Sequence, residues 1–239
     1  MVTKVRTIVV TDKDIVGGIL ITTFITELDG KRDRYESVVK LSRDLIIECK
    51  RIIFLMHRIT VMATPSMKKK LLDEANCRLT AARNKFLLQI AKALDGSDHY
   101  LYLKSYDWAL EEFIEACAFY KFLVSRELLL YDEVVSKLQF NDCAETSTQN
   151  LYLTLPEVTY LMGLFDIGGE LMRFAISEAS SGDYQIVQEV TNYLRSLHEC
   201  YQYLGNVPQN ADWAKKSSVF RTSLVKVYSC CRNSSSDFA

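Results

Sequence analysis

The sequence predicts an all-α fold, a bundle of about six long helices. The chain of 239 residues contains only 9 Gly and 3 Pro, which is too few breakers for a turn-rich β protein. Apolar side chains also recur every three or four residues over long stretches, the spacing that gives a helix one buried face. With 49% hydrophobic residues, the chain can bury a substantial core, in one large domain or two small ones.

The first predicted helix covers about residues 22–60. One continuous apolar stripe runs along it, formed by Val38, Leu41, Leu45, Cys49, Ile52, Met56 and Ile59. Pro65 disfavours the α conformation at Thr64, so the helix should end before this pair. Residues 1–21 show no clear period and are expected to form an N-terminal extension of unclear structure.

The next predicted elements are separated by short polar breaks. A helix over about 67–94 should end where Gly96 can adopt the left-handed backbone conformation. A long helix over about 98–127 and a short one over about 131–138 follow. The polar stretch 141–150 predicts a loop, so almost no strand is expected.

The last part of the chain predicts three more helices. Pro156 suits the first turn of a helix that runs to about Ser180. After a break of small and polar residues, helices follow over about 184–204 and 211–231. The tail, 233–239, is expected to fray.

The composition restricts the class of protein. No run of 18 apolar residues occurs, so no membrane-spanning helix is expected, and the N-terminal region lacks the pattern of a signal peptide. The seven Cys include no CxxC motif, which predicts neither a disulfide framework nor a zinc site. Free cysteines within helical patterns fit a reducing compartment. We therefore expect a cytoplasmic location, with the nucleus as a second one.

Charge is unevenly distributed along the chain, although the net charge is only −1. Residues 1–70 contain 14 Lys and Arg against 8 Asp and Glu, whereas residues 71–239 contain 15 against 22. This balance excludes a uniformly basic nucleic-acid-binding protein but allows a polyanion site near the first helix. Candidate RNA-phosphate contacts there are Lys40, Arg43, Lys50, Arg51 and Arg58. The alternative is that these cations pair with acids of the same helix.

A first pair of carboxylates stands out on an otherwise apolar helix, WALEEFIEACAF (108–119). On a helical wheel, Glu112 and Glu115 lie within roughly 60° of each other. Glu111 is displaced toward another face, the side of Ala118. The pair therefore shares one stripe that is not an obviously wet face.

A second pair, Asp166 and Glu170, lies four residues apart and also shares one stripe. If the two pairs converge, four ionised carboxylates need a cation, because like charges raise each other's pKa. An oxygen-only ligand set suits Mg²⁺ or Mn²⁺, whereas the lack of His in these motifs disfavours redox iron. The alternative is a set of surface ion pairs, such as Glu170 with Arg173.

Other candidate residues have a simpler interpretation. His57, His99 and His198 have no neighbouring nucleophile pattern and are expected to be packed or surface histidines. The aromatic stretch 98–108 can stack nucleic-acid bases, but core packing and subunit contact are the favoured interpretation.

Four segments carry a family pattern. They are ELDGKRDRYESVVKLSRDLIIECKRIIFLMHRIT (27–60), LEEFIEACAFYKFLVSRELL (110–129), FDIGGELMRFAISEASSGD (165–183) and YLRSLHECYQYLGNV (193–207). These segments resemble the translin family, in particular its translin-associated factor X (TRAX) branch. The resemblance covers about residues 22–232, which are therefore expected to form one translin-like helical domain. Residues 1–21 resemble nothing in the family, and the basic nuclear-targeting tail associated with TRAX proteins is not evident there.

The resemblance implies an all-helical subunit that assembles with translin subunits into a closed hetero-oligomeric shell. It also implies a Mg²⁺-dependent endoribonuclease that cleaves single-stranded RNA, such as silencing-complex passenger-strand fragments and tRNA-processing fragments. Components of the silencing complex would be indirect partners. By motif, the family's catalytic and metal-binding acids correspond to Glu112, Glu115, Asp166 and Glu170. Glu111 stands where other members can carry a neutral residue, so the resemblance implies that it is peripheral. The alternatives are a non-catalytic RNA-binding or scaffold subunit of the same complex, and a helical adaptor with no nucleic-acid role.

Overall fold

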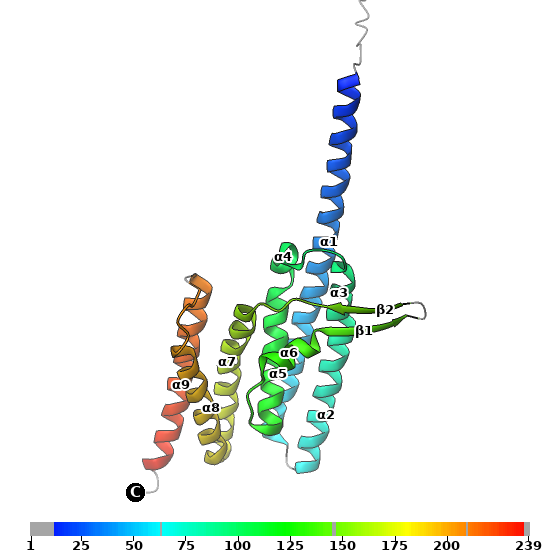
Figure 1. The fold of residues 1–239 in the computed structure, drawn as a ribbon. Coiled ribbons are helices and arrows are strands. Elements are labelled where there is room, and N and C mark those ends of the chain that lie inside the picture. Colours follow the sequence, from blue (N-terminus) through cyan, green and yellow to red (C-terminus); the bar gives the residue numbers. More distant parts are fainter. Residues whose placement is uncertain (1–11, 63, 145–146, 209, 237–239) are drawn as a thin grey trace, which may run out of the picture.

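The structure, a computed structural model, describes residues 12–236 apart from 63, 145–146 and 209. Helices make up most of this part of the chain, which confirms the predicted all-α class (Figure 1). The helices lie roughly side by side in an elongated bundle, and a small β-hairpin extends from one side of it.

The first helix, α1, spans Asp12–His57 and is longer than predicted. Its N-terminal part projects beyond the other helices (Figure 1). Exposed apolar side chains on this part are Ile21, Phe24, Ile25 and Leu28. The sequence did not reveal the first part of this helix because residues 12–21 show no clear apolar period. The prediction of an extension without clear structure is therefore wrong for residues 12–21, while residues 1–11 lie outside the described part.

A 3₁₀ turn, η1 (Arg58–Val61), follows α1 and precedes α2 (Pro65–Ala82). Pro65 occupies the first turn of α2, where a missing backbone amide has no cost. The Thr64 hydroxyl caps the same end by accepting a hydrogen bond from the amide of Met67, at 3.3 Å. The break predicted at this pair is therefore confirmed.

The helix predicted over 67–94 contains an irregular turn. From α2 the chain passes through η2 (Arg83–Leu87), which is a π-helical turn, into α3 (Leu88–Leu94). A single π turn leaves the apolar spacing almost intact, so periodicity does not disclose it. Gly96 has a φ of 68°, the left-handed conformation expected at the end of this stretch.

The long helix predicted over 98–127 is broken, so that prediction is wrong in its first part. It consists of α4 (His99–Tyr102), the 3₁₀ turn η3 (Leu103–Ser105) and α5 (Asp107–Ser125). Between them Tyr106 leaves the helical region, with φ −140° and ψ −5°, and its side chain is only 1% exposed. Burial of this large ring overrides the local helical pattern. The short helix that follows, α6 (Tyr131–Lys137), agrees with the prediction.

The polar stretch predicted as a loop forms a β-hairpin instead. Strands β1 (Gln139–Ala144) and β2 (Ser147–Tyr152) pair antiparallel. Phe140 lies opposite Leu151 in the register, and both side chains are buried. Two apolar anchors at the base of the hairpin thus hold a pairing that the polar composition of 141–150 concealed.

The three C-terminal helices are confirmed as α7 (Glu157–Ser181), α8 (Tyr184–Gln202) and α9 (Ala211–Ser236). Gly182 has a φ of 86° and ends α7 in the left-handed conformation. α9 extends to Ser236, into the tail that was predicted to fray, and residues 237–239 lie outside the described part.

The packing order of the helices places the two acidic segments next to each other. α5 packs against α1 on one side and against α7 on the other, and α7 also packs against α8 and α9 (Figure 1). The carboxylate pairs of α5 and α7 therefore lie on neighbouring helices. In the described part of the chain, no helix combines the length and apolarity needed to cross a membrane.

Gly168 and Gly169 on α7 offer a matched pair of substitutions. A Cβ at Gly168 would lie 2.5 Å from the buried ring of Phe220 on α9, whereas the nearest atom to a Cβ at Gly169 is 4.0 Å away. We expect Gly168→Ala to lower the free energy of unfolding by about 1–3 kcal/mol through overpacking. Gly169→Ala should raise it by about 0.5–1 kcal/mol, because alanine favours the helix. Urea denaturation measures both, and equal effects would contradict the close contact of α7 with α9.

Candidate functional site

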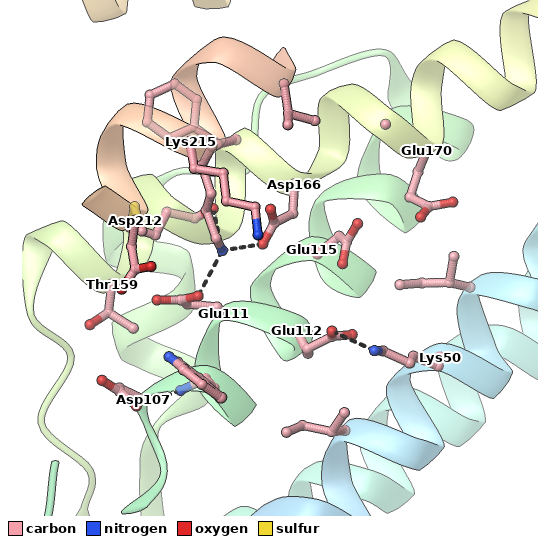
Figure 2. Close-up of a pocket in the computed structure, with 18 of the residues that line it drawn as sticks. Lys50, Asp107, Glu111, Glu112, Glu115, Thr159, Asp166, Glu170, Asp212 and Lys215 are labelled. Atoms are coloured by element: carbon pink, nitrogen blue, oxygen red, sulfur yellow. Dashed lines mark hydrogen bonds and ion pairs between the residues drawn. The ribbon is translucent and has the colours of Figure 1, made fainter. Parts of the chain in front are cut away.

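The two predicted carboxylate pairs face one cavity. It has a volume of about 1330 Å³ and is lined by residues of α1, α5, α7 and α9 (Figure 2). Among the lining residues are all four predicted acids, Glu112, Glu115, Asp166 and Glu170. The cavity exceeds the range of about 300–1,000 Å³ that is usual for small-molecule sites, so it has room for a segment of a polymer.

Glu111, which was expected to be peripheral, belongs to this cavity. Its side chain is buried and accepts a hydrogen bond from Nζ of Lys216 on α9, at 2.7 Å. The same ammonium donates to Asp166 and, at 3.4 Å, to the carbonyl of Met162. The prediction for Glu111 is wrong because a helical wheel shows one helix and cannot show the cation that another helix supplies. No signal within its own helix marks Lys216.

Opposing effects set the pKa of Lys216. Burial disfavours the charged form, but the hydrogen bonds to Asp166 and Glu111 outweigh it and raise the pKa above its usual value. Lys216 is therefore an ammonium at neutral pH. Burial also raises the pKa of Asp166 and of Glu111, against the lowering effect of Lys216.

Glu112 forms an ion pair with a lysine of α1. One of its oxygens lies 3.1 Å from Nζ of Lys50. Its other oxygen, Oε2, is buried without a hydrogen-bond partner. A buried carboxylate oxygen with no partner costs free energy unless a ligand supplies one. Burial raises the pKa of Glu112, and Lys50 opposes this shift.

Glu170 contacts two basic side chains. His57 Nε2, at the end of α1, lies 2.6 Å from its Oε2, and Arg173 contacts both carboxylate oxygens. The alternative pairing of Glu170 with Arg173 is therefore present, but it lies on the wall of the cavity. The imidazole also packs on Phe119, with ring centroids 4.8 Å apart. Burial, followed by the charge of Arg173, lowers the pKa of His57 to about 4, so the neutral ring can donate Nε2–H to Glu170.

The expectation of packed or surface histidines therefore misses the role of His57 in the cavity wall. Its nearest signal is its position directly after the apolar stripe residue Met56, which does not disclose a partner 113 residues away. His99 is buried against Tyr152, as expected. His198 stacks on Phe220.

Glu115 has the most perturbed carboxyl of the cavity. It is buried, and the loss of hydration together with the charges of Asp166 and Glu112 raises its pKa from 4.5 to about 8. Among the described residues, six other acids line the cavity against four cations, Lys50, Arg173, Lys215 and Lys216, so its negative charge is not fully compensated. A site of this kind favours the entry of a cation.

The raised pKa of Glu115 makes stability depend on pH. Below pH 4.5 the carboxyl is protonated in both states, whereas between pH 4.5 and about 8 only the unfolded chain releases the proton. Stability therefore falls as pH rises through this window. We expect Glu115→Gln to flatten this slope and to be more stable near pH 8 by on the order of a few kcal/mol. Thermal unfolding of both chains in EDTA measures the effect, and parallel curves would contradict it.

The donor set fits a hard divalent cation in its chemistry, because every acid contributes oxygen and Glu112 Oε2 lacks a partner. Yet in the described part of the chain, no three His, Cys, Asp or Glu side chains are arranged to hold a metal ion. Ion pairs explain why the acids are not arranged around a metal position. Asp166, Glu112 and Glu170 are oriented toward Lys216, Lys50 and Arg173, respectively.

The five basic residues predicted to contact RNA do not form one patch. Lys50 lines the acidic cavity. Lys50, Arg51 and Arg58 also line a second groove, of about 600 Å³, between α1 and α2. Lys40 and Arg43 are exposed on α1 and line neither. Arg51 pairs with Glu48 of the same helix at 3.6 Å, which is the alternative the sequence left open.

Two aromatic side chains stand open on the wall of the acidic cavity. Phe54 on α1 is 73% exposed and Trp108 on α5 is 69% exposed. The aromatic stretch 98–108 thus contains two kinds of residue. Tyr102 and Tyr106 are buried in the core as expected, whereas Trp108 is exposed and available for contact.

The sequence comparisons agree with each other. The sequence model of the translin family matches residues 33–233. Translin-associated protein X of Mus musculus is 35% identical over 222 residues, which cover 87% of this chain and 75% of that protein. The translin-associated protein X homolog of Schizosaccharomyces pombe is 25% identical over 211 residues, which cover 87% of this chain and 84% of that protein.

The fold was also compared with solved structures. A solved structure of AfC3PO in complex with duplex RNA superposes with a TM-score of 0.65, over 91% of this chain and 97% of that chain. The sequence identity is 20%, so this similarity concerns the fold alone. It confirms the translin-like helical bundle over nearly the whole chain.

Proposed function

The chain belongs to the translin family, and from this premise we propose that it is the catalytic subunit of a translin–TRAX endoribonuclease. The proposed substrate is single-stranded RNA, such as passenger-strand fragments of the silencing complex and tRNA-processing fragments. The proposed cofactor is Mg²⁺, with Mn²⁺ as a substitute. The proposed location is cytoplasmic, with the nucleus as a second one.

The observation that carries this proposal is the convergence of acids from α5 and α7 on one cavity large enough for a polymer segment. Glu112, Glu115, Asp166 and Glu170 would hold the cation through their oxygens. A bound divalent cation supplies Lewis acidity at phosphorus and a water molecule of lowered pKa. The raised pKa of Glu115 supports this assignment, because strongly perturbed pKa values are concentrated at functional sites.

The other residues of the cavity have supporting roles in this proposal. Lys50 and Lys216 supply positive charge beside the acids, which favours the approach of a phosphate. His57 holds one oxygen of Glu170 and so orients this carboxylate. Phe54 and Trp108 offer open rings on which unpaired bases can stack.

The proposed partners are translin subunits, which would complete a hetero-oligomeric shell. The exposed apolar residues of the projecting part of α1, Ile21, Phe24, Ile25 and Leu28, follow the spacing of one helix face. Such a face is typical of a helix that packs against another subunit. Contact with silencing-complex components would be indirect.

The test is cleavage of a labelled single-stranded RNA by the chain assembled with its translin partner. We expect cleavage with Mg²⁺, loss of cleavage in EDTA, and recovery when Mg²⁺ is restored. Cleavage that continues in EDTA would refute the metal assignment. RNA binding without cleavage under any metal would instead favour a non-catalytic RNA-binding subunit.

A further inference from the structure

Lys216 places its positive charge among the acidic side chains of the cavity. Its ammonium has three protons, and the structure shows three acceptors around it: Glu111 at 2.7 Å, Asp166, and the Met162 carbonyl at 3.4 Å. Its side chain reaches into the cavity from α9 and is 23% exposed. The next residue on the same helix, Lys215, also lines the cavity but is exposed (Figure 2).

We propose that Lys216 is a tethered cation that occupies the acidic cluster when no metal is bound, and that a divalent cation displaces it from Asp166. Lys216 would then set the metal affinity of the cavity. This inference rests on the proposed function, because it assumes that the metal binds at Asp166.

Lys216 and a divalent cation compete for the same carboxylate oxygens. A lysine ammonium and a Mg²⁺ or Mn²⁺ ion both require the carboxylate of Asp166, and one oxygen cannot serve both fully. The ammonium is already in place and carries one charge, so the arriving ion must break its hydrogen bonds before it gains the carboxylate. This competition also accounts for the observation that the described acids are not arranged to hold a metal while Lys216 is engaged.

The electrostatics favour the exchange, because Lys216 does not neutralise the cavity. Even without Glu115, six of the described acids line it, and Lys50, Arg173, Lys215 and Lys216 offset only part of their charge. Glu112 Oε2 remains without a partner. A divalent ion brings one charge more than the ammonium it replaces, and it can use oxygens that Lys216 does not reach.

A purely structural role for Lys216 makes a different prediction. If the lysine only cross-links α9 to α5 and α7, its removal destabilises the fold and leaves metal affinity unchanged or weaker. If it competes with the metal, its removal strengthens metal binding. The sign of the change in affinity therefore separates the two roles.

The first experiment is a calorimetric titration of Mn²⁺ into the full-length chain and its Lys216→Met and Lys215→Met variants. We expect Lys216→Met to bind Mn²⁺ about 10- to 100-fold more tightly, because the metal no longer displaces charge-assisted hydrogen bonds. Lys215→Met makes the same charge change at the adjacent position and should leave the affinity close to that of the wild type. Equal or weaker binding by Lys216→Met overturns the inference while leaving the metal site intact. An absence of Mn²⁺ binding in all three chains overturns both.

A second measurement uses the wild-type chain and does not depend on the folding of a variant. An amine-reactive ester labels lysines according to their freedom, and mass spectrometry reads each site. We expect Mg²⁺ to increase the labelling rate of Lys216 in step with site occupancy and to leave Lys215 unchanged. Labelling of Lys216 that does not respond to Mg²⁺, in a chain shown by calorimetry to bind it, overturns the inference.

Discussion

Asp166→Asn should lower Mg²⁺-dependent cleavage of single-stranded RNA by about 10²–10³-fold, the loss typical when one electrostatic contributor is removed from a catalytic site. Asparagine keeps the volume of the side chain but removes its charge. Asp166 is the acid that the proposed metal and Lys216 share, so no other carboxylate replaces it in both contacts. The measurement is the single-turnover rate of the chain assembled with its translin partner.

The control for this variant is Asp212→Asn. Asp212 lines the same cavity from the first turn of α9, but it is exposed. The two substitutions therefore remove the same charge from the same cavity, at different depths. Unchanged assembly and thermal stability of Asp166→Asn would show that the fold is intact. Full cleavage by Asp166→Asn in a complex reconstituted from purified subunits would remove this residue from the proposed site.

Phe165→Ala should lower the free energy of unfolding by about 3–5 kcal/mol, the usual cost of deleting a large buried ring. The ring of Phe165 stacks on Tyr201 at 3.9 Å with an interplanar angle of 16°. It also meets Trp213 edge-on at 4.9 Å and Phe220 at 5.8 Å. One side chain of α7 thus joins α8 and α9, and the gap left by alanine cannot be filled by a single neighbour. Urea denaturation measures the loss.

Phe54→Ala is the matched control, since it removes the same ring from a position that is 73% exposed. Its effect on stability should stay within about 0.5 kcal/mol. A cost below about 1 kcal/mol for Phe165→Ala would mean that the aromatic cluster does not bind α8 and α9 to the bundle. The result also bears on the cavity, because α9 carries Lys216 into it.

The fold could largely be predicted from the sequence where burial follows a helical period. The break at Pro65, the left-handed Gly96 and Gly182, and the start of α7 after Pro156 are local features with local causes. The elements that the sequence failed to predict depend on tertiary contacts. Tyr106 breaks a helix because its ring is needed in the core, and the β-hairpin depends on two apolar residues that meet only after pairing. Neither cause is visible in a window of neighbouring residues.

The residues of the candidate site likewise fall into those that the sequence could select and those that it could not. Helical spacing was enough to select Glu112 with Glu115, and Asp166 with Glu170, because each pair lies on one helix. It could not assign Glu111, whose place depends on Lys216, 105 residues later in the chain. Lys50 was selected for its charge, as an RNA contact, but its carboxylate partner is supplied by α5. Contacts between helices require the packing order, which spacing along one helix does not contain.

The length of α1 has a mechanical consequence. Its 46 residues, at 1.5 Å each, form a rod of roughly 69 Å. One end stands clear of the bundle (Figure 1). Near the other end, Lys50 and His57 contact Glu112 and Glu170. One unbroken helix therefore connects the free end of α1 mechanically with these two contacts, and α2, α3 and α5 hold it along the way.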